Sequence, residues 1–176
     1  MRRRLLFVLL PAALAAGCQL FSAEQASAVA ELRPTRGHTA SGRVYFQQVG
    51  ARVHMHAVVT GLRAGREHGF HVHEAGDCSA ADGSSARGHF NPYGKPHAHH
   101  SAPERHAGDL PVLTADAAGR AVVKADLNII TVASGPAGIV GRSVIVHAEP
   151  DDFRTQPHGN SGARIACGVI RRAPRD

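Results

Sequence analysis

Residues 52–60 of this chain read Arg-Val-His-Met-His-Ala-Val-Val-Thr, and their apolar and polar side chains largely alternate. Successive side chains of an extended chain point to opposite faces, so Val53, Met55 and Ala57 fall on one side. A period of two is typical of a β-strand that buries one face in a core. We therefore predict a strand over residues 52–60 with these three side chains inside.

Short segments of the same kind recur along the chain, and Gly or Pro stands between them. They contain β-branched residues and cover residues 43–47, 70–73, 120–127, 143–147 and 166–170. No helical period or internal repeat is visible, and 176 residues suffice for one domain with its own core. Many short strands between turn signals predict an all-β sandwich or barrel.

Two long stretches interrupt this pattern. Residues 75–110 are rich in Gly, Ser, His and Pro, and residues 148–165 contain two prolines and two glycines. Loops of this length inside a compact domain are usually functional or disordered. We therefore expect the functional side chains on or beside these two loops.

The N-terminus differs from the rest of the chain. Three arginines follow Met1, residues 5–16 form an apolar run broken only by Pro11, and Gly17 precedes Cys18. This layout predicts a secretory signal peptide over residues 1–17. The apolar run is too short to span a bilayer, which takes about 20 residues. A buried N-terminal helix is the alternative.

Residues 14–18, Leu-Ala-Ala-Gly-Cys, resemble the lipobox at which bacteria attach a diacylglyceryl group to cysteine. Ala15 stands where leucine is usual, and ordinary cleavage at a later small residue is the alternative. We expect cleavage before Cys18 and a lipid on Cys18 that anchors the protein to a membrane of the cell envelope, in a periplasmic or other extracytoplasmic location. The chain then divides into a tether over residues 18–27, a folded domain over 28–172 and a tail over 173–176.

The cysteine count agrees with export. The three cysteines are Cys18, Cys78 and Cys167, and an odd count in an exported protein needs an explanation. A lipid on Cys18 removes the odd one and leaves the other two to pair in an oxidising compartment. Two buried thiols are the alternative.

The charge balance gives little evidence about partners. The chain has 20 Lys and Arg against 14 Asp and Glu, and the predicted signal peptide holds three of the arginines. The 17 remaining basic residues are scattered, aromatic residues are few and tryptophan is absent, so we expect no nucleic-acid partner. The modest positive balance is compatible with an anionic substrate.

Thirteen histidines raise the question of a metal site. His71 and His73 end a predicted strand, where their spacing places both imidazoles on one face and within reach of one metal. His54 and His56 have the same spacing without a continuing cluster, so we interpret them as a solvated strand face. His147 closes another predicted strand, at the start of the second long loop.

A second group of metal-binding residue types lies in the first long loop. Three imidazoles and one carboxylate suit a tetrahedral zinc site, and the loop supplies His89, His97, His106 and Asp109. The alternative is a polar, solvated His-rich loop, and for His99 and His100 we prefer that interpretation.

Five blocks of the sequence, in this order, resemble the signature blocks of the copper/zinc superoxide dismutases. They span residues 69–74, 88–92, 105–110, 146–152 and 162–170. The resemblance extends from about residue 28 to residue 170, and the length of the segment from Cys78 to His89 is closer to the bacterial branch. It implies an eight-stranded Greek-key barrel or sandwich, with the two long loops carrying the site.

The resemblance also implies the roles of the site residues. Copper would be bound by His71, His73, His89 and His147, and zinc by His89, His97, His106 and Asp109. His89 would therefore bridge both ions as an imidazolate. For the second zinc ligand we choose His97 by its spacing from His89 and His106, with His99 as the fallback.

The remaining implied roles concern residues around the ligands. Asp151 would accept hydrogen bonds from His71 and His97, and Arg164 would stand beside copper and guide the anion. Cys78 and Cys167 would form the family disulfide.

The activity implied is dismutation of superoxide to dioxygen and hydrogen peroxide, with the electron carried by copper and a proton by His89. The main alternative is a non-catalytic envelope lipoprotein that binds copper or zinc. A zinc hydrolase is disfavoured because the zinc set is closed, with no open position for water. The sequence leaves a monomer and a homodimer open.

Overall fold

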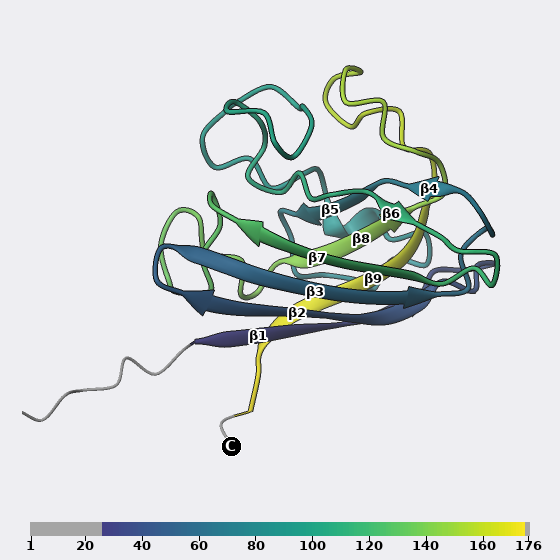
Figure 1. Ribbon diagram of the computed structural model, residues 1–176, viewed down its shortest axis with the longest axis horizontal. Helices are drawn as coiled ribbons and strands as arrows, with labels where there is room; N and C mark the ends of the chain where they lie inside the picture. The colour runs from purple at the N-terminus through teal and green to yellow at the C-terminus, as the bar shows by residue number, and fades with distance from the viewer. Residues whose placement is uncertain (1–25, 175–176) are drawn as a thin grey trace, which may run out of the picture.

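The computed structural model of the chain describes residues 26–174 (Figure 1). The predicted signal peptide, Cys18 and most of the predicted tether lie outside the described residues, as do the last two residues of the tail. Within residues 26–174, no helix is long or apolar enough to cross a membrane.

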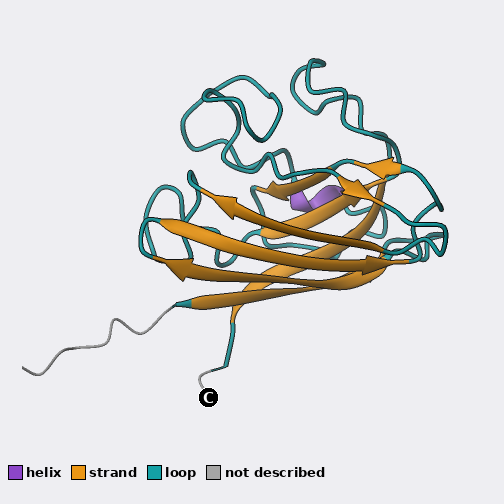
Figure 2. Cartoon of the chain, in the orientation of Figure 1, coloured by secondary structure: helices purple, strands orange, loops and turns teal. Residues whose placement is uncertain are grey.

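The described residues form nine strands and a single turn of 3-10 helix, η1 (Figure 2). The strands are β1 Ser27–Pro34, β2 Ser41–Val49, β3 Arg52–Thr60, β4 Glu67–His68, β5 Phe70–His73, β6 Leu113–Thr114, β7 Ala121–Leu127, β8 Ser143–His147 and β9 Arg164–Arg172; η1 is Ser84–Ala86. The predicted all-β class is confirmed, and all six predicted strands are present. Sequence patterning missed β1, β4 and β6, and β1 begins at Ser27, the last residue assigned to the tether.

Seven of the strands form one antiparallel sheet in the order β5-β8-β9-β1-β2-β3-β7, and β4 pairs with β6. Gly69 alone separates β4 from β5, so we treat the two as one interrupted strand. The number of strands is then the expected eight. Because β6 also lies beside β7, the β4–β6 pair stands between the two edges of the sheet. The sheet curls around its core as a partial barrel, consistent with the expected fold (Figure 1).

The core lies on the inner face of this curled sheet. In β3 the predicted inner side chains Val53, Met55 and Ala57 are at most 2 % exposed, whereas His54 and His56 face outward. This alternation is what an antiparallel sheet with one solvated face requires. The prediction for the two faces of β3 is therefore confirmed.

β5 and β8 depart from the alternation because every residue of both strands is buried. Figure 2 shows the reason: the two long loops rise on the same side of the sheet and cover these strands. A strand covered on both faces can keep polar side chains only where they have partners. The histidines of β5 and β8 are thus enclosed between the core and the loops.

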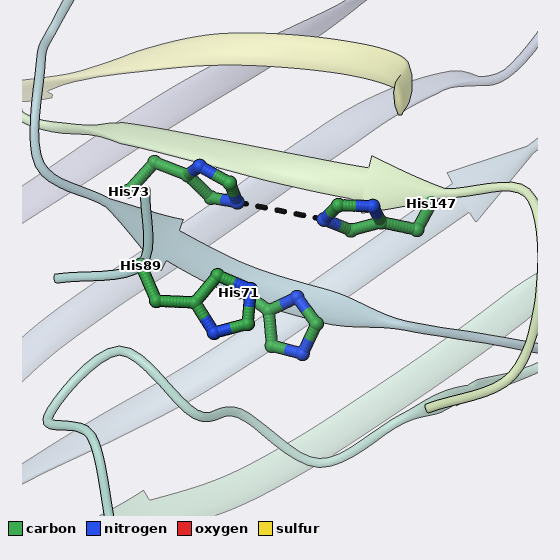
Figure 3. Close-up of side chains that lie close together, drawn as sticks. All are labelled: His71, His73, His89 and His147. Carbon is green, nitrogen blue, oxygen red and sulfur yellow. Dashed lines mark hydrogen bonds between the residues drawn. The ribbon is translucent and has the colours of Figure 1, made fainter. Parts of the chain in front are cut away.

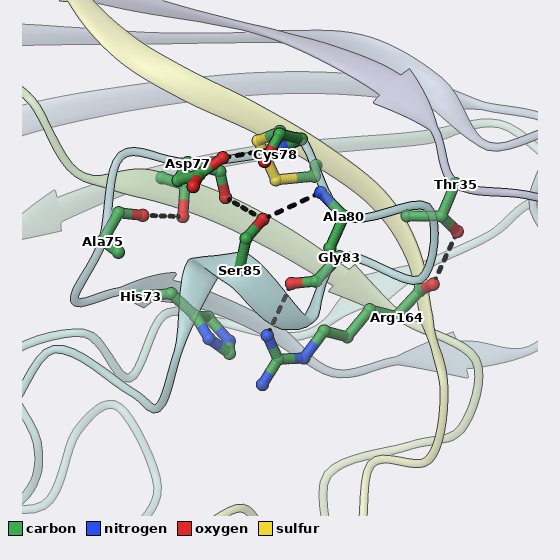
Figure 4. The surroundings of a disulfide bond; sticks show 12 residues. Thr35, His73, Ala75, Asp77, Cys78, Ala80, Gly83, Ser85 and Arg164 are labelled. Carbon is green, nitrogen blue, oxygen red and sulfur yellow. Dashed lines mark hydrogen bonds between the residues drawn. A yellow bond between two sulfur atoms is a disulfide. The ribbon is translucent and has the colours of Figure 1, made fainter.

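A disulfide joins the first long loop to β9 (Figure 4). Cys78 and Cys167 have Cα atoms 5.8 Å apart across 89 positions of sequence. Their expected pairing is confirmed. The covalent bond fixes the start of the first loop against the strand that begins with Arg164.

Candidate metal centre

Four buried histidines converge where β5 and β8 meet the first loop (Figure 3). His71 and His73 come from β5, His147 ends β8, and a backbone bridge to His73 brings in His89. One nitrogen of each ring lies within 4.8 Å of the corresponding nitrogen of every other ring. The Nε2 atoms of His73 and His147 are 3.4 Å apart, and the rings of His71 and His89 stack with centroids 3.9 Å apart.

The first loop reaches this place because it returns twice to β5. Phe90 N donates to the Val72 carbonyl at 2.8 Å, and Val72 N donates to the Gly108 carbonyl at 2.9 Å. A side chain at residue 108 would overlap the Val72 carbonyl, so only glycine permits this approach. These backbone bonds bring the segments that carry His89 and Asp109 alongside the strand that carries His71.

A second set of four side chains lies beside the first and shares His89. It consists of His89, His97, His106 and Asp109, all of them buried. The Nδ1 atoms of the three histidines lie 2.9 Å (His97), 3.2 Å (His89) and 3.5 Å (His106) from Asp109 Oδ1. Ligands at ordinary zinc distances stand about 3.3 Å apart at the corners of a tetrahedron. The observed spacings therefore fit one zinc ion.

Hydrogen bonds fix which nitrogen of each ring is free. His73 Nδ1 donates to the Arg87 carbonyl at 2.8 Å, His147 Nδ1 to the Gly162 carbonyl at 3.3 Å, and His71 Nε2 to Asp151 at 2.6 Å. A neutral imidazole that donates from one nitrogen carries a lone pair on the other. The lone pairs of the three rings are therefore the nitrogens opposite these donors.

Two ring nitrogens at the centre have no hydrogen-bond partner among the described residues. They are His71 Nδ1 and His89 Nε2, and both are buried. A buried polar atom without a partner costs free energy, so it calls for a missing ligand. Together with the nitrogen-rich donor set, these atoms fit a bound metal ion in the four-histidine set.

Asp151 connects the two sets from the second long loop. Its two carboxylate oxygens accept hydrogen bonds from His71 Nε2 at 2.6 Å and from His97 Nε2 at 2.9 Å. The His97 bond leaves Nδ1 of that ring to face Asp109, with which it forms a hydrogen bond at 2.9 Å in the absence of an ion. One carboxylate thus orients a ring in each set.

Burial and local charges favour the metal-binding protonation states of the four-histidine set and of Asp109. His97 differs, because its hydrogen bonds with Asp109 and Asp151 outweigh burial and raise its pKa to about 9 until an ion replaces the proton. Burial and neighbouring imidazoles hold the pKa of His73 and of His147 well below the ordinary value, and burial lowers the pKa of His89 to about 3. Burial would raise the pKa of Asp109, but hydrogen bonds from His106, His89 and His97 outweigh it and hold that pKa below its usual range. Neutral imidazoles and an ionised carboxylate are the metal-binding forms.

The sequence of this chain matches a known protein family. Residues 40–170 match the family model described as copper/zinc superoxide dismutase (SODC), which is more than half of the chain. The chain belongs to the copper/zinc superoxide dismutase family. Membership gives it an oxidoreductase activity, superoxide dismutation, with copper and zinc as cofactors.

Named relatives agree with the family model. The chain is 37 % identical over 146 residues to superoxide dismutase (Cu-Zn) 2 of Aquifex aeolicus, covering 81 % of this chain and 85 % of the relative. It is 40 % identical over 135 residues to the superoxide dismutase (Cu-Zn) of Deinococcus radiodurans, covering 70 % and 71 %. A superoxide dismutase (Cu-Zn) of Paramecium bursaria Chlorella virus 1 is 40 % identical over 136 residues, covering 73 % and 71 %.

Arg164, which the family resemblance singled out, lies next to the four-histidine set. Its guanidinium donates to the carbonyl of Gly83 at 2.6 Å (Figure 4). It also donates to the carbonyl of Arg87 at 2.6 Å. The Arg87 carbonyl also accepts the hydrogen bond from His73, so one backbone oxygen links the guanidinium to a histidine of the set. Arg87 has φ +64°, an unusual conformation for a residue other than glycine.

Sequence reasoning missed two residues that hold the ligands. The Gln156 side chain accepts a hydrogen bond from the His97 backbone N–H and donates one to the His97 carbonyl, both at 2.8 Å. The buried His68 donates from Nδ1 to the His147 carbonyl at 2.8 Å. An isolated Gln or His gives no such signal in a sequence, because its partner is 59 or 79 positions away.

The structure also distinguishes the three neighbouring histidines of the first loop. His97 is 2 % exposed and belongs to the second set. His99 packs its ring edge-to-face against Phe153 and contacts the tilted ring of His100, and neither histidine belongs to a ligand set among the described residues. The geometry therefore favours His97 over the fallback His99.

Proposed function

We propose that the four-histidine set binds the copper, that the His89, His97, His106 and Asp109 set binds the zinc, and that superoxide is dismutated at the copper. One observation carries this assignment: His89 belongs to both sets, with Nδ1 facing Asp109 and Nε2 buried without a partner within residues 26–174. Four imidazoles suit Cu(II), and a closed set of three nitrogens and one oxygen suits structural zinc.

The residues around the two ions have different roles. Copper, when bound, alternates between Cu(II) and Cu(I) and so exchanges one electron with each superoxide. His89 Nε2 is placed to hold a proton and to release it to the second superoxide, so that two superoxide anions and two protons give dioxygen and hydrogen peroxide. Arg164 attracts the anion, and Asp151 keeps His71 and His97 in their binding orientation.

Metal content measured together with activity tests this function. We expect the purified protein to hold copper and zinc in equal amounts and to dismutate superoxide. Selective copper chelation should abolish the activity while zinc stays bound, and added copper should restore it. A fully copper-loaded protein without activity would instead support the alternative, a non-catalytic metal-binding lipoprotein, which the retained Arg164 and Asp151 do not favour.

We also propose that the protein works in the bacterial cell envelope, anchored through a lipid on Cys18. The arginines after Met1, the apolar run and the lipobox-like residues 14–18 support this placement. The disulfide between Cys78 and Cys167 adds support, because it suits an oxidising compartment and Cys18 is the one cysteine of the sequence outside this pair.

Expression in a bacterial host with an alkyne-labelled fatty acid tests the anchor. The protein should incorporate the label and partition into detergent, whereas Cys18→Ser should do neither. Equal labelling of both proteins would refute lipidation at Cys18.

Light scattering on the same preparations decides between a monomer and the homodimer that the sequence left open.

A further inference from the structure

The described chain enters the partial barrel at the end where β1 begins. The backbone N–H of Ala173 donates to the Ser27 carbonyl at 3.0 Å, and that of Gln48 donates to the Ala26 carbonyl at 2.8 Å. The ends of β9 and β2 therefore flank the start of β1. The loop between β7 and β8 lies at the same end, because the Gln48 side chain accepts two hydrogen bonds from it. We call these segments together the entry end; they are residues 26–28, 47–52, 128–141 and 170–174.

The entry end carries three arginines and no acidic residue. Arg52 is the first residue of β3, and Arg171 and Arg172 are the last residues of β9. All three are exposed, and none of them makes an ion pair with another described residue. The other residues of the entry end are uncharged. Three positive charges therefore face solvent without a counter-charge from the described residues.

Acidic side chains on the adjoining outer face of the sheet already have partners. Glu31 of β1 pairs with Arg43, and a carboxylate oxygen of Asp126 on β7 lies 3.1 Å from His54 Nδ1. A surface that carries one sign of charge attracts ions of the opposite sign. The entry end is thus suited to an anionic partner.

The spacing of the arginines indicates a partner that is itself a surface. The strand order is β9-β1-β2-β3, so two strands stand between Arg52 and the arginine pair of β9. At 4.7–4.9 Å for each neighbouring strand, this separation is about 14 Å across the sheet. A single small anion does not reach both places, whereas an array of anionic headgroups does.

The opposite end of the barrel has a mixed charge. Its turns lie together, since Leu62 N donates to the Gly119 carbonyl at 3.1 Å. These turns hold as many arginines as the entry end, but acidic residues stand among them; the charged residues are Arg63, Arg66, Glu67, Asp116 and Arg120. The unbalanced positive charge is therefore a local feature of the entry end, and the opposite end supplies a matched control.

The proposed anchor brings the entry end close to a membrane. Ser27 follows Cys18 by nine positions, and an extended chain spans at most 3.3–3.6 Å per residue, so the start of β1 stays within about 30 Å of the lipid. Figure 1 shows the two long loops rising from another side of the molecule. A membrane in contact with the entry end therefore leaves these loops open to solvent.

We propose that the entry end is a docking surface for the anionic headgroups of the membrane that holds the lipid, with Arg52, Arg171 and Arg172 as its contacts. The inference rests on the proposed function, because the lipid on Cys18 supplies the proximity. Each arginine close to an anionic bilayer favours contact by about fivefold, over a range of about 10 Å. Val49, 37 % exposed and paired with Arg52 across the hairpin, adds an apolar contact. Docking holds the metal centre toward the solvent from which superoxide arrives.

Flotation with lipid vesicles tests the anchor and the docking surface separately. The metal-loaded mature protein is mixed with vesicles of phosphatidylcholine, with or without phosphatidylglycerol, at low and at high salt. We expect it to float with both kinds of vesicle, because the lipid on Cys18 inserts into either. Flotation with the anionic vesicles alone, and only at low salt, would refute the anchor while supporting the docking surface. A protein that floats with neither kind would overturn both.

Energy transfer then locates the entry end relative to the bilayer. A fluorescent amino acid replaces Ala51, which is exposed next to Arg52, or Ala117, which is exposed at the opposite end, and the acceptor is attached to the headgroups. On phosphatidylglycerol vesicles at low salt, transfer should be strong from residue 51 and weak from residue 117. High salt, or phosphatidylcholine alone, should reduce the transfer from residue 51, because either change removes the electrostatic attraction.

A triple variant tests the arginines directly. Arg52→Gln combined with Arg171→Gln and Arg172→Gln should lower the ratio of docked to undocked protein by about a hundredfold, at about fivefold for each charge. The salt-dependent transfer from residue 51 should then disappear. Copper and zinc content confirms that the variant is folded.

A second triple variant is the matched control. Arg63→Gln combined with Arg66→Gln and Arg120→Gln removes the same charge from the opposite end and should leave the transfer from residue 51 unchanged. Equal losses in the two triple variants would overturn the inference, because net charge and not the entry end would then be the cause.

Two further outcomes would also overturn the inference. The first is equal transfer from residues 51 and 117, which would mean that the domain has no preferred orientation on the bilayer. The second concerns soluble polyphosphate added to the wild type. If polyphosphate binds through the arginines of the entry end while transfer to vesicles does not depend on them, the occupant is a soluble polyanion and not the membrane.

Discussion

His71, His73, His97 and His147 each have one ring nitrogen bonded to a fixed acceptor and the other directed at the metal centre. The acceptors are a carboxylate shared by two rings and two backbone carbonyls. Fixing the tautomer in advance means that the rings need not reorganise when an ion binds. At the scale of single residues, the site therefore depends on groups that never touch the metal.

Replacing Arg164 with alanine should lower the rate of superoxide dismutation by about tenfold or more and weaken its dependence on ionic strength. The guanidinium is a fixed positive charge beside the four-histidine set, held by two carbonyls. Rates measured over a range of salt concentrations, with copper analysis, check this expectation. Arg171→Ala, at an exposed position of β9, changes the net charge equally and should have a much smaller effect. Loss of copper from Arg164→Ala would show that its role is structural.

Gly159→Ala should reduce zinc affinity by 10- to 100-fold, about the range seen when partners of metal ligands are altered. The new methyl group would overlap the Asp151 carboxylate and displace it from His97. Competition with a zinc chelator measures the change. Gly94→Ala is the matched control, because Gly94 has φ +61° with nothing within 4 Å of the added carbon. If both variants lose zinc equally, the backbone conformation and not the overlap is responsible.

At the scale of elements, the two long loops and β9 form one unit around the site. Gln156 ties the second loop to His97 on the first, and Arg164 ties β9 to the carbonyls of Gly83 and Arg87. The disulfide joins the same first loop to the same strand. The loops are thus held by contacts with one another and with β9, since apart from η1 and short bridges they contain no regular structure.

Removing the disulfide by Cys78→Ser with Cys167→Ser should lower the free energy of unfolding by about 4 to 5 kcal/mol on the chain-entropy model. The bond closes a loop over 89 positions, and most of its effect is to restrict the unfolded chain. Urea unfolding of the metal-free protein measures the loss. Cys18→Ser leaves the pair intact and should unfold like the wild type. A double variant as stable as the wild type would contradict the expectation.

At the scale of the whole molecule, protonation of the site is coupled to folding. Burial would lower the pKa of His97, but its hydrogen bonds with Asp109 and Asp151 outweigh burial and raise the pKa to about 9. A pKa that folding raises contributes stability fully below the unfolded value of 6.5 and loses it as the pH rises through the folded value. Folding lowers the pKa values of His73 and His147, so these two residues change the free energy of unfolding only at pH values below that window.

The metal-free protein should therefore become less stable between pH 6.5 and pH 9, the ordinary and folded pKa values of His97. Each pH unit costs about 1.4 kcal/mol, so the total loss is on the order of 3 kcal/mol. Urea unfolding at several pH values measures it. Asp151→Asn removes one of the two carboxylates and should flatten the dependence, as should zinc, which takes the place of the proton on His97. A metal-free wild type with constant stability over this range would refute the prediction.

The sequence by itself determined what depends on neighbours along the chain. Alternation over residues 52–60 specified a strand and its inner face, and the spacing of His71 and His73 placed two imidazoles on one face. Ordered blocks carried the family resemblance, and with it the two sets of side chains that the structure brings together.

Only the tertiary structure decided which distant groups meet. The carbonyl of Arg87 accepts hydrogen bonds from both His73 and Arg164. The Gln156 side chain is hydrogen-bonded to the backbone of His97, and the rings of His158 and His89 pack edge-to-face. No local pattern encodes these contacts, because they arise where two irregular loops pack on a curled sheet. Hydrogen bonds and ring contacts between segments tens of residues apart depend on the final path of the backbone, and this path is set by the packing of the entire domain.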